Sequence, residues 1–201
     1  MLDLFKNKLD KTFVRYVITF LAKYEINPNI LTIIGLLSGV ISAYFIYKGH
    51  FIISIIPIIL SASCDICDGW LARATKRVSK FGKILDTISD KYVEGLFGLA
   101  LAFILKDFLI PGYAWAIIAV FGSIIISLVS NIGDSMTEKK VFKLTSRFDR
   151  AILLLIGFLL AGLYGPIYLT YSIVVIAILS HITALTLLSQ YYFIFKEDNK
   201  N

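Results

Sequence analysis

The chain of 201 residues has little of what marks several other protein classes. Its only two cysteines, Cys64 and Cys67, are three positions apart, so there is no disulfide framework. It has four prolines and 13 glycines, and only 17% of its residues are charged, which excludes collagen-like and disordered chains. The basic residues exceed the acidic ones, giving a net charge of +6, but they form no dense patch that would indicate nucleic-acid binding.

Apolar side chains, in contrast, are abundant. Hydrophobic residues make up 58% of the chain, or about 117 positions, whereas soluble domains have roughly 45–50% apolar residues. A soluble domain of this length cannot bury so much apolar surface. Six membrane spans of about 20 residues need about 120 such positions, so the composition predicts a polytopic membrane protein without a separate soluble domain.

The predicted fold class is an all-α integral membrane protein with six transmembrane helices preceded by an N-terminal amphipathic helix. Turn signals such as Pro111-Gly112 and Gly165-Pro166 separate the apolar runs. A single membrane domain over 1–201 is expected, with an interfacial helix over 1–26, spans over 27–195 and a polar tail over 196–201. The expected spans cover residues 28–47, 51–74, 82–105, 110–133, 148–165 and 167–195.

The first 24 residues show helical periodicity, with aromatic and apolar residues on one face and lysines on others. This pattern is typical of a helix lying in the membrane interface; a helix packed on protein is the alternative. The segment lacks the uninterrupted apolar core of a cleaved signal peptide, so we do not expect its removal.

The distribution of Lys and Arg predicts the orientation. Eighteen lie in the two termini and in the turns after the second and fourth spans, against two, Lys48 and Lys106, in the other three turns. By the positive-inside rule, a multi-pass protein of the cell membrane with both termini in the cytoplasm is expected. No internal repeat is visible, which argues against inverted-repeat transporters; an ion-coupled transporter remains an alternative of a different class.

Four aspartates interrupt the second and third spans. Asp65 and Asp68 are three residues apart, and Asp86 and Asp90 are four apart, so each pair shares a helix face. A turn over 76–80 folds the two helices into a hairpin, which allows the pairs to face each other. Asp65 lies about 21 Å along its span from Phe51, near the cytoplasmic end, so the site is expected to face the cytoplasm.

Such a group of carboxylates is costly in a membrane unless cations balance it. Two divalent ions would balance four charges, and an all-oxygen ligand set favours Mg²⁺ or Mn²⁺. Gly69 leaves room for a bulky ligand and Arg73 can bind a phosphate, so the site predicts phosphoryl chemistry. The structural alternative is a set of buried ion pairs with Arg73 and Lys91.

These residues carry a family resemblance. They resemble, without a gap, the signature of the CDP-alcohol phosphatidyltransferases, and the expected architecture is similar to theirs over nearly the whole chain. The resemblance implies an enzyme of phospholipid biosynthesis, in which the hydroxyl of a small polar acceptor attacks the lipid-bearing phosphate of a CDP-lipid and CMP leaves. The eight matching positions are Asp65, Asp68, Gly69, Ala72, Arg73, Gly82, Asp86 and Asp90.

The resemblance also implies individual roles. The four aspartates would hold two Mg²⁺ or Mn²⁺ ions, and Asp90 would be the general base on the acceptor hydroxyl. Gly69 and Arg73 would contact the CDP diphosphate. A homodimer is expected on the same ground. The remaining contacts to the CDP-lipid would come from Asn29, Ile30, Leu31, Thr32 and Ser79.

The acceptor depends on a second group of cations. Arg147 and Arg150 resemble the Arg-x-x-Arg of the phosphatidylinositol phosphate synthase branch, which favours inositol phosphate; glycerol 3-phosphate and serine remain open, as does a purely topological role for both arginines. The sequence Gly133-Asp134-Ser135 departs from that branch, which tends to carry basic residues there. The role of Glu94 stays open between fixing a metal ligand and pairing with Lys91. Aspartate-rich prenyltransferases, a rival class, would release pyrophosphate and use other spacings.

Overall fold

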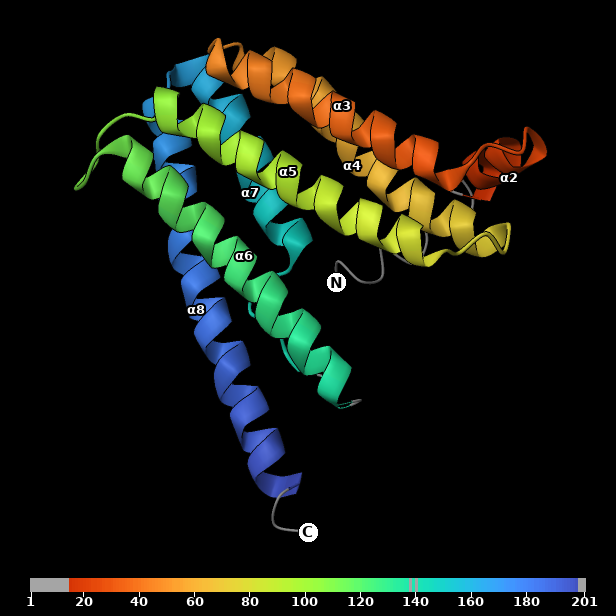
Figure 1. Ribbon diagram of the computed structural model, residues 1–201. Helices are drawn as coiled ribbons and strands as arrows, with labels where there is room; N and C mark the ends of the chain where they lie inside the picture. The colour runs from red at the N-terminus through yellow and green to blue at the C-terminus, as the bar shows by residue number, and fades with distance from the viewer. Residues whose placement is uncertain (1–14, 138, 140, 199–201) are drawn as a thin grey trace. The chain divides into compact units, whose positions relative to one another are not determined.

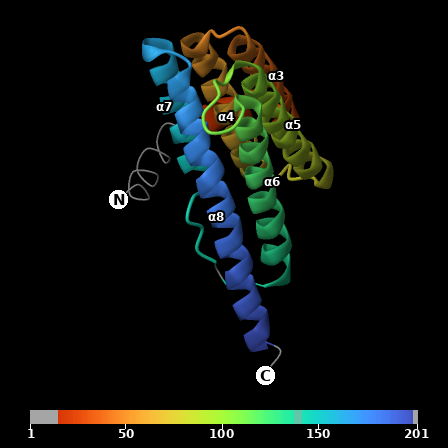
Figure 2. The same cartoon turned by 90° about the vertical axis from the view of Figure 1, so that its left-hand side faces the viewer.

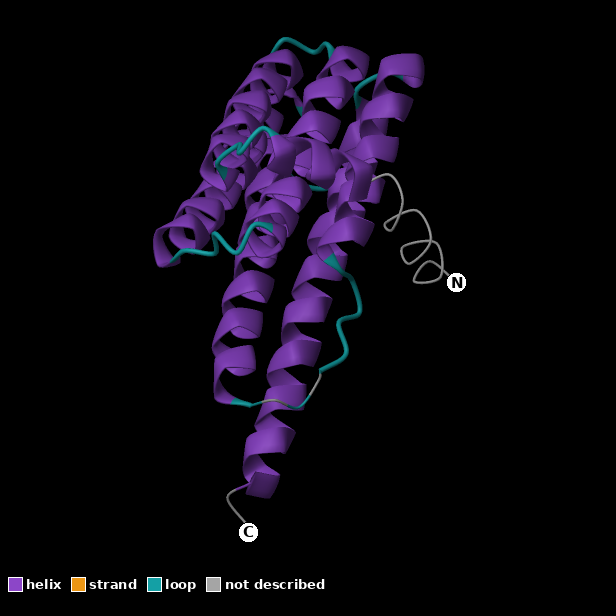
Figure 3. Ribbon diagram, turned by 90° about the vertical axis from the view of Figure 1, so that its right-hand side faces the viewer, coloured by secondary structure: helices purple, strands orange, loops and turns teal. Residues whose placement is uncertain are grey.

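The computed structural model describes residues 15–137, 139 and 141–198, and over these residues its regular elements are helices (Figures 1 and 3). The expected all-α class is confirmed there. The described residues fall into two compact units: those of Met1–Ala43 with Ile56–Val93, and those of Tyr44–Ile55 with Glu94–Asn201. The helices are α2 (Arg15–Lys23), α3 (Pro28–Tyr47), α4 (Phe51–Ala74), α5 (Lys80–Ile104), α6 (Gly112–Met136), α7 (Arg147–Tyr164) and α8 (Ile167–Asp198).

Helices occupy all six ranges that were expected to span the membrane, and α3 and α4 have the predicted bounds. Four of them, α3, α4, α6 and α8, are long and apolar enough to cross a bilayer by length and composition. The other two, α5 and α7, carry more charge: α5 contains Asp86, Asp90 and Glu94 among its apolar residues, and α7 begins with an arginine pair. These two helices contain Asp86, Asp90 and the arginine pair, while Asp65 and Asp68 lie in the more apolar helix α4.

In the first unit, α3 packs closely against both neighbouring helices. A β-carbon at Gly35 would lie 3.2 Å from Cβ of Cys64 in α4, and one at Gly39 would lie 2.5 Å from a methyl group of Val93 in α5. Because these glycines lie one turn apart, α3 offers a side-chain-free strip that lets both helices approach. Cys64 is buried and both cysteines are free thiols, in keeping with packing roles.

The short helix α2 contacts the protein through one face. Ile18 is buried with Leu31 of α3 and Leu71 of α4, while Phe20 and Tyr24 lie exposed with their rings 4.8 Å apart. Protein packing, the alternative for this segment, thus applies to the Ile18 face. Residues 1–14 of the predicted interfacial helix lie outside the described part of the chain, and its location in the interface stays a prediction.

In the second unit, α8 runs beside α6 (Figures 1 and 2) and also packs against α7. A β-carbon at Gly133 would lie 2.1–2.4 Å from ring atoms of Tyr191, so the ring fills the space over this glycine. The Tyr191 hydroxyl donates a 2.7 Å hydrogen bond to Asp134. The buried residues of this α6–α8 core are Ile126, Ala184, Leu187 and Tyr191.

Candidate metal and phosphate site

The α4–α5 hairpin of the first unit carries the acidic motif. The Ser79 side chain accepts a 2.9 Å hydrogen bond from the Gly82 N–H, which caps the start of α5. Arg77 donates from Nη1 to the Glu25 carbonyl at 3.1 Å and so ties this turn to the one before α3. Local capping and this one long contact set where α5 starts and hence where its aspartates lie.

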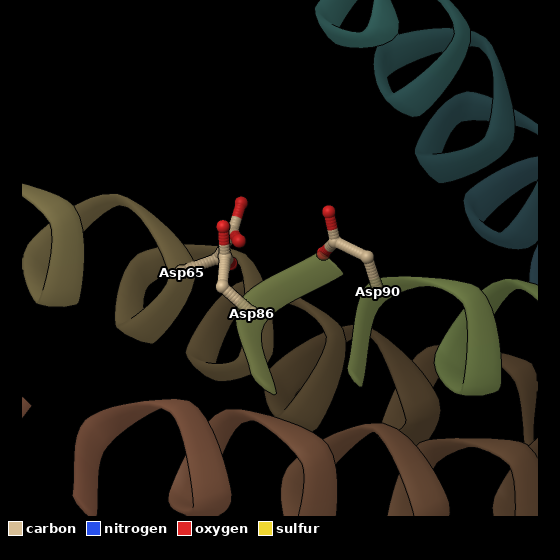
Figure 4. Close-up of side chains that lie close together, drawn as sticks. All are labelled: Asp65, Asp86 and Asp90. Carbon is tan, nitrogen blue, oxygen red and sulfur yellow. The ribbon is translucent and has the colours of Figure 1, made fainter. Parts of the chain in front are cut away.

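Three of the four aspartates of the motif lie close together. Asp65 from α4 and Asp86 and Asp90 from α5 each offer a carboxylate oxygen within 4.8 Å of the others, and all three are half-buried. Their carboxyl groups project from the same side of the two helices (Figure 4). Three converging carboxylates on rigid helices can hold a hard divalent cation, since Mg²⁺ and Mn²⁺ prefer oxygen ligands.

Asp68 takes a different partner. It is only 5% exposed, and it accepts a 2.5 Å hydrogen bond from the hydroxyl of Thr32 in α3, itself 7% exposed. Asp68 is thus bonded to the neighbouring helix and is not one of the three that converge, but it lies within reach of the charges of Asp65 and Asp90. The hydroxyl, together with a backbone hydrogen bond from Gly69, stabilises this buried carboxylate.

Arg73 lies across the open side of Gly69. Its two terminal nitrogens are 3.6 Å from where a Gly69 β-carbon would be, and its guanidinium carbon is 5.8 Å from the centre of the Trp70 ring. The side of Gly69 that was predicted to receive a ligand is therefore free of helix packing, and the one group over it is a long, flexible cation. The indole contact limits the positions available to that cation.

The residues predicted to contact the nucleotide are of two kinds, polar ones near the motif and apolar ones in α3. Asn29 and Ser79 lie together over Gly82, since a β-carbon there would be 3.0 Å from an oxygen of each side chain. Thr32 reaches Asp68. Ile30 and Leu31, which lie between Asn29 and Thr32 in the sequence, are apolar and differ in exposure. Leu31 is 8% exposed and packs in the core with Ile18, while Ile30 is 49% exposed.

The two arginines lie in the second unit, at the start of α7. Ser146 caps this helix in a capping box: its hydroxyl accepts from the Asp149 N–H at 3.2 Å, and Asp149 accepts from the Ser146 N–H at 2.8 Å. Arg150 is half-buried and donates to the Thr145 carbonyl at 3.5 Å and to the Ser123 hydroxyl at 3.4 Å. Arg147, one turn earlier, is exposed.

Comparison with known proteins agrees with the motif. The family model for CDP-alcohol phosphatidyltransferases matches residues 25–191. The chain belongs to the CDP-alcohol phosphatidyltransferase family. It is therefore a membrane enzyme of phospholipid biosynthesis, a transferase of substituted phosphate groups.

Two relatives of this transferase are named for inositol phosphate products. A phosphatidylinositol phosphate synthase of Corynebacterium glutamicum is 30% identical over 171 residues, covering 83% of this chain and 78% of its own length. An archaetidylinositol phosphate synthase of Pyrococcus horikoshii is 45% identical over 83 residues, covering 40% of this chain and 44% of its own.

A solved structure confirms the fold. Phosphatidylinositol phosphate synthase of Mycobacterium tuberculosis, crystallised with CDP-DAG bound, matches this transferase with a TM-score of 0.77 at 20% identity, over 90% of this chain and 94% of that one. A second crystal structure of the same mycobacterial enzyme, in complex with manganese and citrate, gives the same TM-score. At this identity the likeness bears on the fold alone.

Sequence reasoning on the transferase missed several polar contacts. Ser123, Thr183 and Gln190 were not singled out, although Arg150 and the residues before it bond to them. Their partners lie 27–48 positions away, so no local spacing marks them. The Trp70–Arg73 contact, in contrast, has the i, i+3 spacing of neighbours on a helix and was visible in the sequence.

Proposed function

We propose that this enzyme transfers a phosphatidyl-type group, diacyl- or dialkylglycerol phosphate, from a CDP-lipid to the hydroxyl of inositol phosphate and releases CMP. The observation that carries the proposal is the convergence of Asp65, Asp86 and Asp90 on the α4–α5 hairpin, inside the family motif. The names of the two relatives support inositol phosphate as the acceptor. The mycobacterial complex with CDP-DAG supports a CDP-lipid donor.

The aspartates fit a Mg²⁺ or Mn²⁺ site. Asp65, Asp86 and Asp90 would hold an ion, and when bound it would stabilise negative charge on the phosphoryl oxygens. The proposed second ion requires Asp68, whose carboxylate is bonded to Thr32, and four carboxylates balance two divalent ions in charge. The mycobacterial structure with manganese supports the choice of metal.

The other predicted side chains have separate roles in the proposed reaction. Asp90 takes the proton of the acceptor hydroxyl as general base. Arg73 binds the diphosphate of the donor through its guanidinium, above the open side of Gly69. Asn29 and Ser79 contribute polar groups to the nucleotide, and Thr32 acts through Asp68; Ile30 and Leu31 contribute backbone and packing.

The acceptor's phosphate is assigned to Arg147 and Arg150, because a pair of guanidinium groups at a helix start suits a phosphate dianion. Glycerol 3-phosphate is the second candidate, since Asp134 stands where related synthases tend to have cations and accepts a hydrogen bond from Tyr191. Serine carries no phosphate and would not use the arginine pair. Glu94 belongs to the charge environment of Arg150, which favours a role beside the acceptor over one at the metal.

We further propose six spans in the cell membrane, with both termini and the site facing the cytoplasm, and a homodimer. The four long apolar helices and the excess of Lys and Arg on one side support the spans and their orientation, while the homodimer rests on the family resemblance alone. α5 and α7 would be the remaining spans, with their charged ends at the cytoplasmic side. The division into an interfacial helix over 1–26, spans over 27–195 and a tail over 196–201 remains part of the proposal.

The test is CMP release by the purified protein in lipid vesicles that contain CDP-lipid and Mg²⁺ or Mn²⁺. Inositol phosphate, glycerol 3-phosphate, serine and inositol are compared, and a chelator serves as control. We expect the fastest metal-dependent release with inositol phosphate. Faster release with another acceptor would overturn the choice of acceptor, and absence of CMP with all four acceptors would overturn the proposed reaction.

A further inference from the structure

The connection before α7 is attached to α8 by a side-chain amide. The Gln190 Oε1 accepts from the Phe142 N–H and its Nε2 donates to the Phe142 carbonyl, both at 2.8 Å. One side chain thereby satisfies both backbone polar groups of a residue that has no helix or sheet to do so. Two hydrogen bonds to one residue fix its orientation as well as its position.

A second attachment lies two turns earlier on α8. The hydroxyls of Thr145 and Thr183 are 2.8 Å apart, and both residues are buried. Because Thr183 donates its proton to the Leu179 carbonyl at 2.7 Å, Thr145 must be the donor between the two hydroxyls. The described residues 141–146 are therefore held at both ends of the segment.

This segment supports an arginine of the proposed acceptor site. Arg150 donates from Nη1 to the Thr145 carbonyl and from Nη2 to the Ser123 hydroxyl. Thr145 thus uses its hydroxyl to bind α8 and its carbonyl to bind the guanidinium. Glu94 and Asp149 add negative charge around Arg150, and Arg147 adds positive charge.

We propose that Thr183 and Gln190 are positioning residues that hold Arg150 ready for the phosphate of the acceptor; this inference rests on the proposed function. A long arginine side chain loses much rotamer freedom when it binds an anion. A carbonyl fixed from α8 removes part of that freedom before the ligand arrives, so less affinity is lost on binding. The effect is specific to the anionic acceptor, because neither residue contacts the acidic motif among the contacts described.

The experiment measures CMP release by full-length Thr183→Val and Gln190→Leu in vesicles, varying inositol phosphate and CDP-lipid separately. Both changes keep the side-chain volume and remove the hydrogen bonds to the segment. We expect the KM for inositol phosphate to rise about five-fold, with kcat and the KM for CDP-lipid within about two-fold of the unchanged protein. In an Arg150→Ala background, Gln190→Leu should cause no further rise, because it acts through the guanidinium.

Two controls separate positioning from helix stability. Thr183→Ser keeps the hydroxyl and should restore the acceptor KM. Thr186→Val, one turn along α8, removes a hydroxyl that donates only to the Thr183 carbonyl among the described contacts, and should leave all parameters unchanged. Gln190 is only half-buried, so Gln190→Leu carries the test if Thr183→Val fails to fold.

The remaining outcomes are decisive. An unchanged acceptor KM in both variants, or equal changes in both KM values and in kcat, overturns the positioning role while the proposed function stands. Absence of turnover by the unchanged protein with both inositol phosphate and glycerol 3-phosphate overturns the proposed function, and this inference with it. If the unchanged protein uses only glycerol 3-phosphate, the same variants are measured with that acceptor. Because it also carries a phosphate, the same rise in its KM is expected.

Discussion

The acidic α4–α5 hairpin of the first unit differs in construction from the arginine region of the second, which comprises Arg147, Arg150 and the described residues 141–146. The hairpin places three aspartates together from a stretch of the chain between Asp65 and Asp90, on two consecutive helices. The arginine region depends on hydrogen bonds between residues 38 and 48 positions apart. A group of converging carboxylates can thus be encoded in one local motif, whereas the surroundings of Arg150 are held by distant parts of the chain.

The difference has a functional reading in the proposed enzyme. The proposed metal ligands and base would lie at the reacting phosphate and hydroxyl, so changes in the hairpin should lower kcat. The proposed arginine contacts would be with a part of the acceptor that does not react, so changes there should raise the acceptor KM. Each variant below tests whether the two regions can be separated in this way.

The largest effect is expected for Asp90→Asn. The amide cannot accept the proton of the acceptor hydroxyl and is a weaker metal ligand, so kcat should fall by about 10²–10⁴-fold. Binding of CDP-lipid, measured directly, should change far less. Thr87→Val is the matched control on the same helix, since its hydroxyl bonds only the Lys83 carbonyl among the described contacts. Near-normal turnover by Asp90→Asn would remove this residue as the base.

A smaller effect is expected for Arg150→Ala. Loss of a charged donor to a phosphate should raise the KM for inositol phosphate about 10–100-fold and leave the KM for CDP-lipid nearly unchanged. Arg150→Lys keeps the charge but not the planar guanidinium, so its KM for inositol phosphate should lie between those of the unchanged protein and Arg150→Ala. If Arg150→Ala raised the KM for CDP-lipid as much as the KM for inositol phosphate, the two regions would not have separate functions.

Packing should also differ between the units. Gly133→Ala in the second unit places a methyl group against the Tyr191 ring, which is 4% exposed and held by Asp134, so it should destabilise by about 1–3 kcal/mol. Gly39→Ala in the first unit meets the methyl groups of Val93, a smaller side chain that is only half-buried and has more room to shift than the Tyr191 ring, and should cost less. Gly95→Ala meets nothing within 4 Å and should be neutral or stabilising. Thermal unfolding of the three variants in one detergent ranks their stabilities. An equal loss of stability in all three would contradict the predicted order.

The smallest effect is expected for Ser146→Ala, which breaks the capping box at the start of α7. It should cost about 1 kcal/mol of stability, again measured by thermal unfolding. Ser135→Ala, whose exposed hydroxyl donates to the Ile132 carbonyl, is the control and should have no measurable effect. A larger loss in the control would mean that exposed serines matter here for another reason.

Much of the fold was predictable because apolar runs in a membrane chain end where charges, Gly and Pro gather. The bounds of α3 and α4 follow from Asn27-Pro28, Lys48-Gly49 and the basic turn after Arg73. The convergence of Asp65, Asp86 and Asp90 was predictable as well, since helical spacing and a short turn leave few other arrangements.

The remaining features depend on rotation and neighbours that spacing does not specify. Asp65 and Asp68 share a helix face, yet only Asp68 reaches Thr32, because α3 packs on that side of α4. Thr183 and Gln190 lie in an apolar helix, where a polar residue with a distant partner looks the same as one that bonds its own backbone. Ile18 likewise belongs to an amphipathic face that suits protein as well as lipid.

The attachment of residues 141–146 to α8 also fixes an order of assembly. Synthesis proceeds from the N-terminus, and early segments can fold first, so the acidic hairpin is complete while the chain that contains Thr183 and Gln190 is still to be made. A nascent chain that stops before residue 183 has every aspartate of the motif and both arginines, but neither of the groups that hold Phe142 and Thr145. In the proposed enzyme, α8 would therefore have to be made before the surroundings of the earlier arginines are complete.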